Sequence, residues 1–247
     1  MTTILVTGSA ATVAVACLPF LAMPAPKSWP FIAASSGLQL VYFLLLAQTY
    51  RIADMSVAYP VMRGAAPLLV AISSSFMPGR ALTPQTWLGI GLICMGIVGM
   101  ALRQRRGSGI GTALALLNAV AIASYTLVDG EGVRRSGATA AYTLWIFLFT
   151  GVPLVAWASL RRKAALARCF RLHWRAGAMG GCGTVASYGL ALWAMTLAPV
   201  AVVAALRETS ILFAVAISAL WLRERVGRAR IAAACLVAAG ALVLRVA

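Results

Sequence analysis

Residues 176–222 read AGAMGGCGTVASYGLALWAMTLAPVAVVAALRETSILFAVAISALWL. In these 47 residues the charged side chains are Arg207 and Glu208 alone. A helix that crosses the hydrocarbon core of a bilayer needs roughly 20 mostly apolar residues, so this stretch is too long for one crossing. Pro199 suits the first turn of a helix. The stretch therefore predicts two membrane-spanning helices, one over 176–197 and one over 199–222.

The whole chain has the same character as this stretch. It has 247 residues, of which 62% are hydrophobic and 11% charged, and its mean hydropathy is +0.92. A soluble domain is about 45–50% apolar and about 25% charged, which excludes a soluble, disordered or fibrous protein. A membrane β-barrel would alternate polar and apolar residues, whereas this chain has long unalternating runs of Ala, Leu, Val and Ile. The sequence predicts an all-α integral membrane protein.

Nine membrane-spanning helices are expected, joined by short loops with no separate soluble domain. Asp129-Gly130-Glu131 is assigned to the loop that follows the fifth helix. The longest loop, 161–175, carries six basic residues and is expected to lie along the membrane surface. The expected spans are about 4–23, 31–50, 55–77, 87–102, 110–128, 140–160, 176–197, 199–222 and 231–246.

The basic residues indicate orientation. The net charge of +16, from 21 Lys and Arg against 5 Asp and Glu, would suggest nucleic acid in a soluble protein. Here the charges lie in loops beside lipid headgroups, so the expected partner is the bilayer and no nucleic acid. Of the 21 basic residues, 14 fall in loops on the side of residue 1 and 5 on the other side. The positive-inside rule then places residue 1 in the cytoplasm and the C-terminus outside.

An internal repeat has an offset of 144 residues, with 59–102 aligned on 203–246 without a gap. Identities are few, but both copies carry an arginine deep in a span, Arg63 or Arg207. The two spans are five crossings apart, an odd number, so they run in opposite directions. This predicts an inverted-topology repeat, which many secondary transporters share.

Charges at membrane depth are costly, and Arg63, Arg207 and Glu208 each lie about eight residues into a span. Two interpretations remain open: a structural ion pair that locks the bundle, or a polar centre that contacts substrate. The three charges sum to +1, which favours a substrate with a carboxylate or another anionic group. Glu208 is interpreted as the one acidic residue that must be deep, and so as the candidate for coupling to a proton.

Other polar and aromatic residues inside spans extend this candidate site, although Tyr and Trp near span ends are more often interfacial anchors. No metal or cofactor is expected, since the five cysteines form no CxxC motif, the single histidine is His173, and no nucleotide-binding motif occurs. The further candidates for substrate binding are Tyr59, Asn118, Tyr125, Tyr188 and Trp193.

Three segments carry a resemblance to a known family. Residues 53–67 read ADMSVAYPVMRGAAP, residues 198–210 read APVAVVAALRETS with LRER at 222–225, and residues 125–134 read YTLVDGEGVR. They resemble EamA-type members of the drug/metabolite transporter superfamily. That resemblance implies ten helices in two inverted five-helix repeats around a substrate cavity, with repeats at 1–106 and 107–247.

The chain departs from the family pattern in two respects. It lacks the family's first helix, so we expect either a start upstream of Met1 or a shortened form. It also has Gly79-Arg80 where the family commonly has Gly-Glu. The resemblance implies a cytoplasmic C-terminus as well, in conflict with the count of basic residues.

These observations predict a secondary active transporter in the inner membrane. It would move a small organic metabolite, amino-acid-like or carboxylate-bearing, outward by alternating access. Two alternatives stay open, a non-transporting membrane subunit and a membrane-embedded enzyme of lipid metabolism. The substrate, the coupling ion and the oligomeric state are not determined by the sequence.

Overall fold

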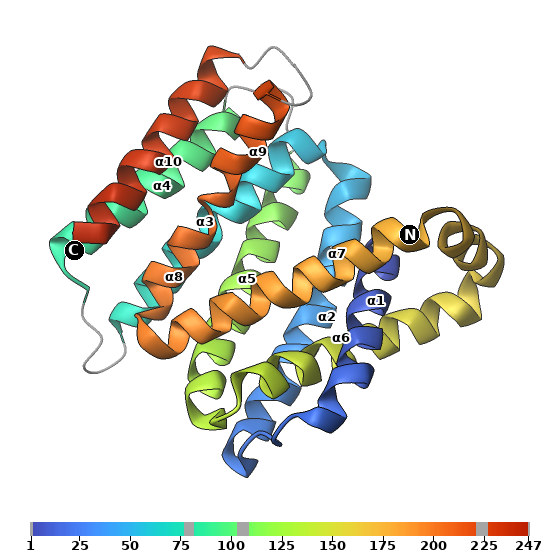
Figure 1. Ribbon diagram of the computed structural model, residues 1–247. Coiled ribbons are helices and arrows are strands. Elements are labelled where there is room, and N and C mark those ends of the chain that lie inside the picture. Colours follow the sequence, from blue (N-terminus) through green and yellow to red (C-terminus); the bar gives the residue numbers. More distant parts are fainter. Residues whose placement is uncertain (1, 77–81, 103–108, 221–226, 247) are drawn as a thin grey trace. The chain divides into compact units, whose positions relative to one another are not determined.

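The computed structural model describes residues 2–76, 82–102, 109–220 and 227–246, and these ranges are helical with no β-strand (Figure 1). Five segments among them are long and apolar enough to cross a membrane: Thr3–Phe20, Pro26–Ile52, Gly109–Ser136, Thr139–Arg161 and Val200–Ile217. This confirms the predicted all-α membrane fold. The helices are α1 (Thr2–Cys17), η1 (Leu18–Phe20), η2 (Pro26–Ser28), α2 (Trp29–Ile52), α3 (Met55–Ser75), α4 (Pro84–Leu102), α5 (Gly109–Ser136), α6 (Thr139–Arg161), α7 (Lys163–Leu197), α8 (Val200–Arg207), α9 (Ser210–Leu220) and α10 (Arg228–Val246).

Helix α5 is longer than expected, because it continues past Val128 to Ser136. The assignment of Asp129-Gly130-Glu131 to a loop is therefore wrong. Arg134 of this added segment donates from Nε to the Met195 carbonyl of α7 at 2.8 Å, which satisfies an oxygen in the last turn of that helix. The helix stops where Gly137 takes a left-handed conformation, with φ of 65°.

Helix α7 is also longer than its predicted span, since it begins at Lys163. The basic segment expected along the membrane surface is thus helical. Its backbone is interrupted at His173, where φ is −131° and ψ is 19°, so two helices meet at a kink.

The predicted span 199–222 is divided into α8 and α9 at Glu208 and Thr209. Across the division, hydrogen bonds follow the tighter i→i−3 pattern, from Glu208 N–H to Ala205 O at 3.0 Å and from Ile211 N–H to Glu208 O at 3.1 Å. A short tightened segment within a helix often marks a functional position.

The chain forms two compact units. Unit 1 comprises Met1–Leu40 and Val128–Leu197, and in it α1 packs against α6 and α7. Glycines make this contact close: a Cβ at Gly151 of α6 would lie 2.7 Å from the Thr7 carbonyl oxygen, and one at Gly181 of α7 would lie 2.8 Å from the Ala10 nitrogen. Small residues of this kind let membrane helices approach backbone to backbone.

Unit 2 comprises Val41–Leu127 and Ala198–Ala247. Helices α4 and α10 lie along each other in this unit, while α3 packs against α4 and α8 (Figure 1). A Cβ at Gly240 of α10 would lie 2.7 Å from the Gly89 carbonyl oxygen of α4. A small core joins α3 to α5 through Ala58, Met62 and Ala115.

Each compact unit contains segments from both predicted repeats, 1–106 and 107–247. The repeat assignment remains a prediction from sequence. Three segments used in the sequence argument lie wholly or partly outside the described residues: Gly79-Arg80, the basic residues 103–106 and the segment 222–225.

Candidate functional site

Helix α3 positions Arg63 in unit 2. Two prolines, Pro60 and Pro67, lie inside this helix. Proline has no backbone N–H, so Pro67 cannot give the usual i→i−4 hydrogen bond to the carbonyl of Arg63. Arg63 therefore combines a charged side chain with a backbone carbonyl that lacks its usual helical donor.

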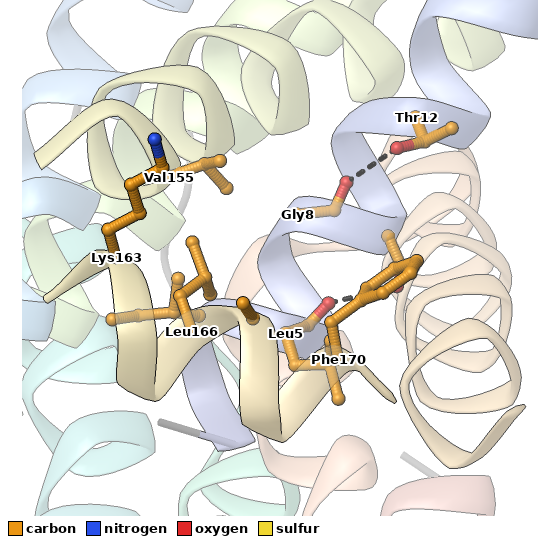
Figure 2. Close-up of a pocket in the computed structure, with 10 residues that line it drawn as sticks. Leu5, Gly8, Thr12, Val155, Lys163, Leu166 and Phe170 are labelled. Atoms are coloured by element: carbon orange, nitrogen blue, oxygen red, sulfur yellow. Dashed lines mark hydrogen bonds between the residues drawn. The ribbon is translucent and has the colours of Figure 1, made fainter. Parts of the chain in front are cut away.

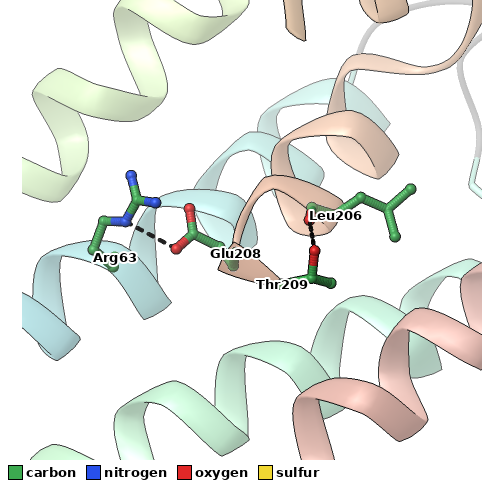
Figure 3. Close-up of polar contacts among 4 residues, drawn as sticks. All are labelled: Arg63, Leu206, Glu208 and Thr209. Atoms are coloured by element: carbon green, nitrogen blue, oxygen red, sulfur yellow. Dashed lines mark hydrogen bonds and ion pairs between the residues drawn. The ribbon is translucent and has the colours of Figure 1, made fainter. Parts of the chain in front are cut away.

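The division between α8 and α9 positions Glu208. Glu208 follows the last residue of α8, with φ of −73° and ψ of −13°. The Leu206 carbonyl oxygen accepts from both the Thr209 hydroxyl, at 2.6 Å, and the Thr209 backbone N–H, at 3.0 Å, so this acceptor is satisfied at the division (Figure 3). The acid thus lies at a helix end inside a span, as binding residues do in transporters with discontinuous helices.

The two residues form an ion pair. Nε of Arg63 lies 2.9 Å from Oε2 of Glu208, and their side chains are 29% and 10% exposed (Figure 3). The structure thus brings together two of the three predicted deep charges. Both earlier interpretations, a structural pair and a substrate-contacting centre, are compatible with this geometry. The third charge, Arg207, is half-buried at the end of α8.

Tyrosines surround this pair in unit 2. The guanidinium carbon of Arg63 is 5.9 Å from the centre of the Tyr59 ring, within cation–π range. Tyr42 and Tyr125 lie close enough to Arg63 to interact with its charge, and their ring centres are 5.9 Å apart. Tyr42 is not among the residues predicted for this site. Its signal is a tyrosine in the middle of α2, away from either end.

Asn118 lies in the core between α5 and α3. It is fully buried, and its Nδ2 donates to the Met62 sulfur at 3.0 Å. Its Oδ1 has no hydrogen-bond partner among the described residues. A buried polar atom without a partner costs about 1–3 kcal/mol, so this amide oxygen needs an explanation.

The remaining two predicted residues, Tyr188 and Trp193, lie in unit 1. Trp193 is exposed on α7. Tyr188 joins a second polar centre, in which its hydroxyl donates to Oδ2 of Asp129 while the Tyr142 hydroxyl donates to Oδ1 at 3.1 Å. Asp129 is fully buried. Glu208 is therefore not the only buried acid among the described residues.

The sequence around Asp129 carries a signal of its burial. Tyr125, Asp129, Gly132 and Ser136 recur at i, i+4, i+7 and i+11, which is the period of one helix face. At Gly132 on this face, a Cβ would overlap the Tyr142 hydroxyl oxygen. The glycine leaves room for the tyrosine that binds the carboxylate. Among the described residues, no three His, Cys, Asp or Glu side chains gather as a metal site would require.

Comparison with known proteins agrees with this architecture. One crystal structure of a protein is similar over 99% of this chain and 87% of that chain, with a TM-score of 0.75 and 20% identity, which shows a shared fold. No curated protein matches the chain. The sequence profile of the EamA-like transporter family matches residues 109–246, more than half of the chain. This multi-pass membrane protein belongs to the EamA-like transporter family.

Proposed function

We propose that this protein is a secondary active transporter that moves a small carboxylate-bearing metabolite outward across the inner membrane by alternating access. Membership of a transporter family supports the general activity. The observation that carries the specific proposal is the Arg63–Glu208 pair at an interrupted helix.

Arg63, which is paired with the Glu208 carboxylate, is suited to bind a substrate that carries a carboxylate of its own. Arginine has five N–H donors in a planar fork that matches carboxylates in a bidentate manner. The contact with Glu208 uses Nε, one of these donors. A substrate carboxylate would compete with Glu208 for the guanidinium, so that Arg63 is paired both when the site is empty and when it is occupied.

Tyr42, Tyr59 and Tyr125 supply the rest of such a site. Each combines an apolar ring with a hydroxyl, and together they suit the carbon skeleton and polar groups of an amino-acid-like molecule. Glu208 is the proposed coupling acid: when the substrate carboxylate takes its place on Arg63, the released Glu208 would be expected to bind a proton.

The test is uptake by proteoliposomes across a panel of metabolites, with and without a pH gradient. We expect accumulation of at least one carboxylate-bearing metabolite, stimulated by the gradient. Glu208→Gln is expected to abolish that stimulation, while Glu131→Gln, which alters the ion pair within α5, should retain it. If no metabolite accumulates under any gradient, or if uptake is confined to cations, the proposal is wrong.

A further inference from the structure

Unit 1 contains a cavity of about 370 Å³ that the transport proposal does not use. It lies where α1 begins, α6 ends and α7 begins (Figure 2). Its size is within the range of sites that bind small ligands. The lining residues are Ile4, Leu5, Gly8, Ser9, Thr12, Val155, Lys163, Leu166, Ala167 and Phe170.

The cavity reaches inward along α1 from Ile4 to Thr12. Eight residues of helix span about 12 Å. Half of a hydrocarbon core of about 30 Å is about 15 Å. The stretch of α1 that lines the cavity is therefore about as long as most of one lipid leaflet is deep.

The wall of the cavity presents carbon rather than hydrogen-bonding groups. The hydroxyls of Ser9 and Thr12 donate to carbonyls of their own helix, those of Leu5 at 2.9 Å and Gly8 at 3.0 Å (Figure 2). Their O–H donors are thus used by the backbone. A polar metabolite would find few partners here, whereas an acyl chain would need none.

One charge, Lys163, belongs to the lining, and it stands at the first residue of α7. Lys163, Leu166, Ala167 and Phe170 follow the i, i+3, i+4, i+7 spacing of one helix face, which places the lysine at the end of an apolar strip. Arg161 and Arg162 precede Lys163 directly and are exposed. Three consecutive basic residues therefore stand where α7 begins, and one of them lines the cavity.

We propose that the cavity binds an anionic phospholipid, with one acyl chain between α1, α6 and α7 and the phosphate against the Lys163 ammonium. Inside a bilayer the apolar wall alone gives little preference, because the surrounding lipid is equally apolar. Shape complementarity holds the chain, and the charge at the mouth selects the headgroup. The site is independent of the proposed transport activity.

The test is native mass spectrometry of the full-length protein in detergent, titrated with phosphatidylglycerol or phosphatidylcholine. The wild-type protein is expected to retain phosphatidylglycerol preferentially. Lys163→Glu should weaken this retention at least roughly fivefold, the effect of about one basic residue at a lipid surface. Arg171→Glu is the matched control, since it makes the same charge change on the same helix outside the lining.

A second pair of variants tests the acyl chain. Ala167→Phe fills the cavity and should reduce phosphatidylglycerol retention, whereas Ala165→Phe, two residues away and outside the lining, should leave it unchanged. Thermal stability of every variant separates loss of the site from loss of the fold. Equal retention of the two lipids by the wild type would overturn the proposal. So would equal effects of Lys163→Glu and Arg171→Glu, or full retention by a folded Ala167→Phe variant.

Discussion

Two glutamates of this chain each pair with an arginine, in different surroundings. Glu131 and Arg135 are one turn apart on α5, with side chains 27% and 50% exposed. Glu208 and Arg63 come from different helices, and the glutamate is buried. Exposed pairs at i, i+4 contribute about 0.3–0.5 kcal/mol, whereas breaking a buried pair costs several times more. The first pair supports one helix; the second fixes α3 against the division between α8 and α9.

Glu208→Gln is accordingly expected to reduce both stability and transport. It leaves the Arg63 charge uncompensated, at a cost near the lower end of the usual 3–5 kcal/mol because Arg63 is partly exposed. Unfolding in detergent measures the effect, with Glu131→Gln as the control that should change stability by about 0.5 kcal/mol or less.

The double variant Arg63→Ala with Glu208→Ala distinguishes a structural pair from a functional one. Removing both charges should recover stability relative to Glu208→Gln but leave uptake abolished. Uptake at the wild-type level by the double variant would show that the charges serve packing alone.

Asp129 permits a prediction in unit 1. Tyr142→Phe and Tyr188→Phe each remove one donor from a fully buried carboxylate, at an expected cost of about 1–3 kcal/mol. The two tyrosines bind one group, so the double variant should deviate from additivity. Unfolding of the two single variants and the double variant forms the cycle. Strict additivity, or no loss in either single variant, would contradict a shared role.

The buried charged residues differ in how well the sequence alone identifies them. Arg63 and Glu208 stand out because each interrupts an apolar run, yet their pairing could not be read from spacing: the repeat aligned Arg63 with Arg207. Asp129 was missed because Gly130 and Glu131 beside it resemble a loop. Its tyrosine partners come from α6 and α7, so its burial depends on distant segments.

At the scale of elements, the apolar runs of the sequence predict where the helices lie. They do not predict where a helix ends or where it is interrupted. Ends depend on tertiary partners, such as the Met195 carbonyl that receives Arg134 beyond the predicted end of α5. The division between α8 and α9 coincides with Arg207, Glu208 and Thr209, but no proline or glycine lies at that point to end a helix, and the flanking residues are apolar on both sides. Hydropathy alone could not reveal it, because a tightened turn buries the same side chains as a regular one.

The contact between α4 and α10 gives a prediction at this scale. Gly240→Ala places a methyl group 2.7 Å from the Gly89 carbonyl oxygen and 3.0 Å from the Ile93 nitrogen, both backbone atoms. We expect a loss of roughly 1–3 kcal/mol, typical of overpacking. Gly91→Ala on α4 is the control, because its Cβ would meet nothing within 4 Å and alanine favours the helix. Equal stability of the two variants would contradict the close approach.

For the whole molecule, composition was sufficient to establish the membrane fold, but orientation is a matter of two competing signals. The loop charges favour a C-terminus outside the cytoplasm, and family resemblance favours one inside. If the 14 basic residues on the side of residue 1 govern insertion, a C-terminal reporter enzyme that is active only outside the cytoplasm should show activity. Strong fluorescence from a C-terminal green fluorescent protein fusion would contradict that orientation and support the family's.

The contact of Gly89 with Gly240 also constrains the gene. Every glycine codon begins with two guanines, and any change at either position that gives another amino acid adds at least a Cβ. Alanine is the smallest such product. Its Cβ would lie 3.0 Å from the Gly240 carbonyl oxygen at position 89, and 2.7 Å from the Gly89 carbonyl oxygen at position 240. At these two codons, only changes at the third base leave the contact intact, so we expect both codons to vary at that base while both glycines are kept.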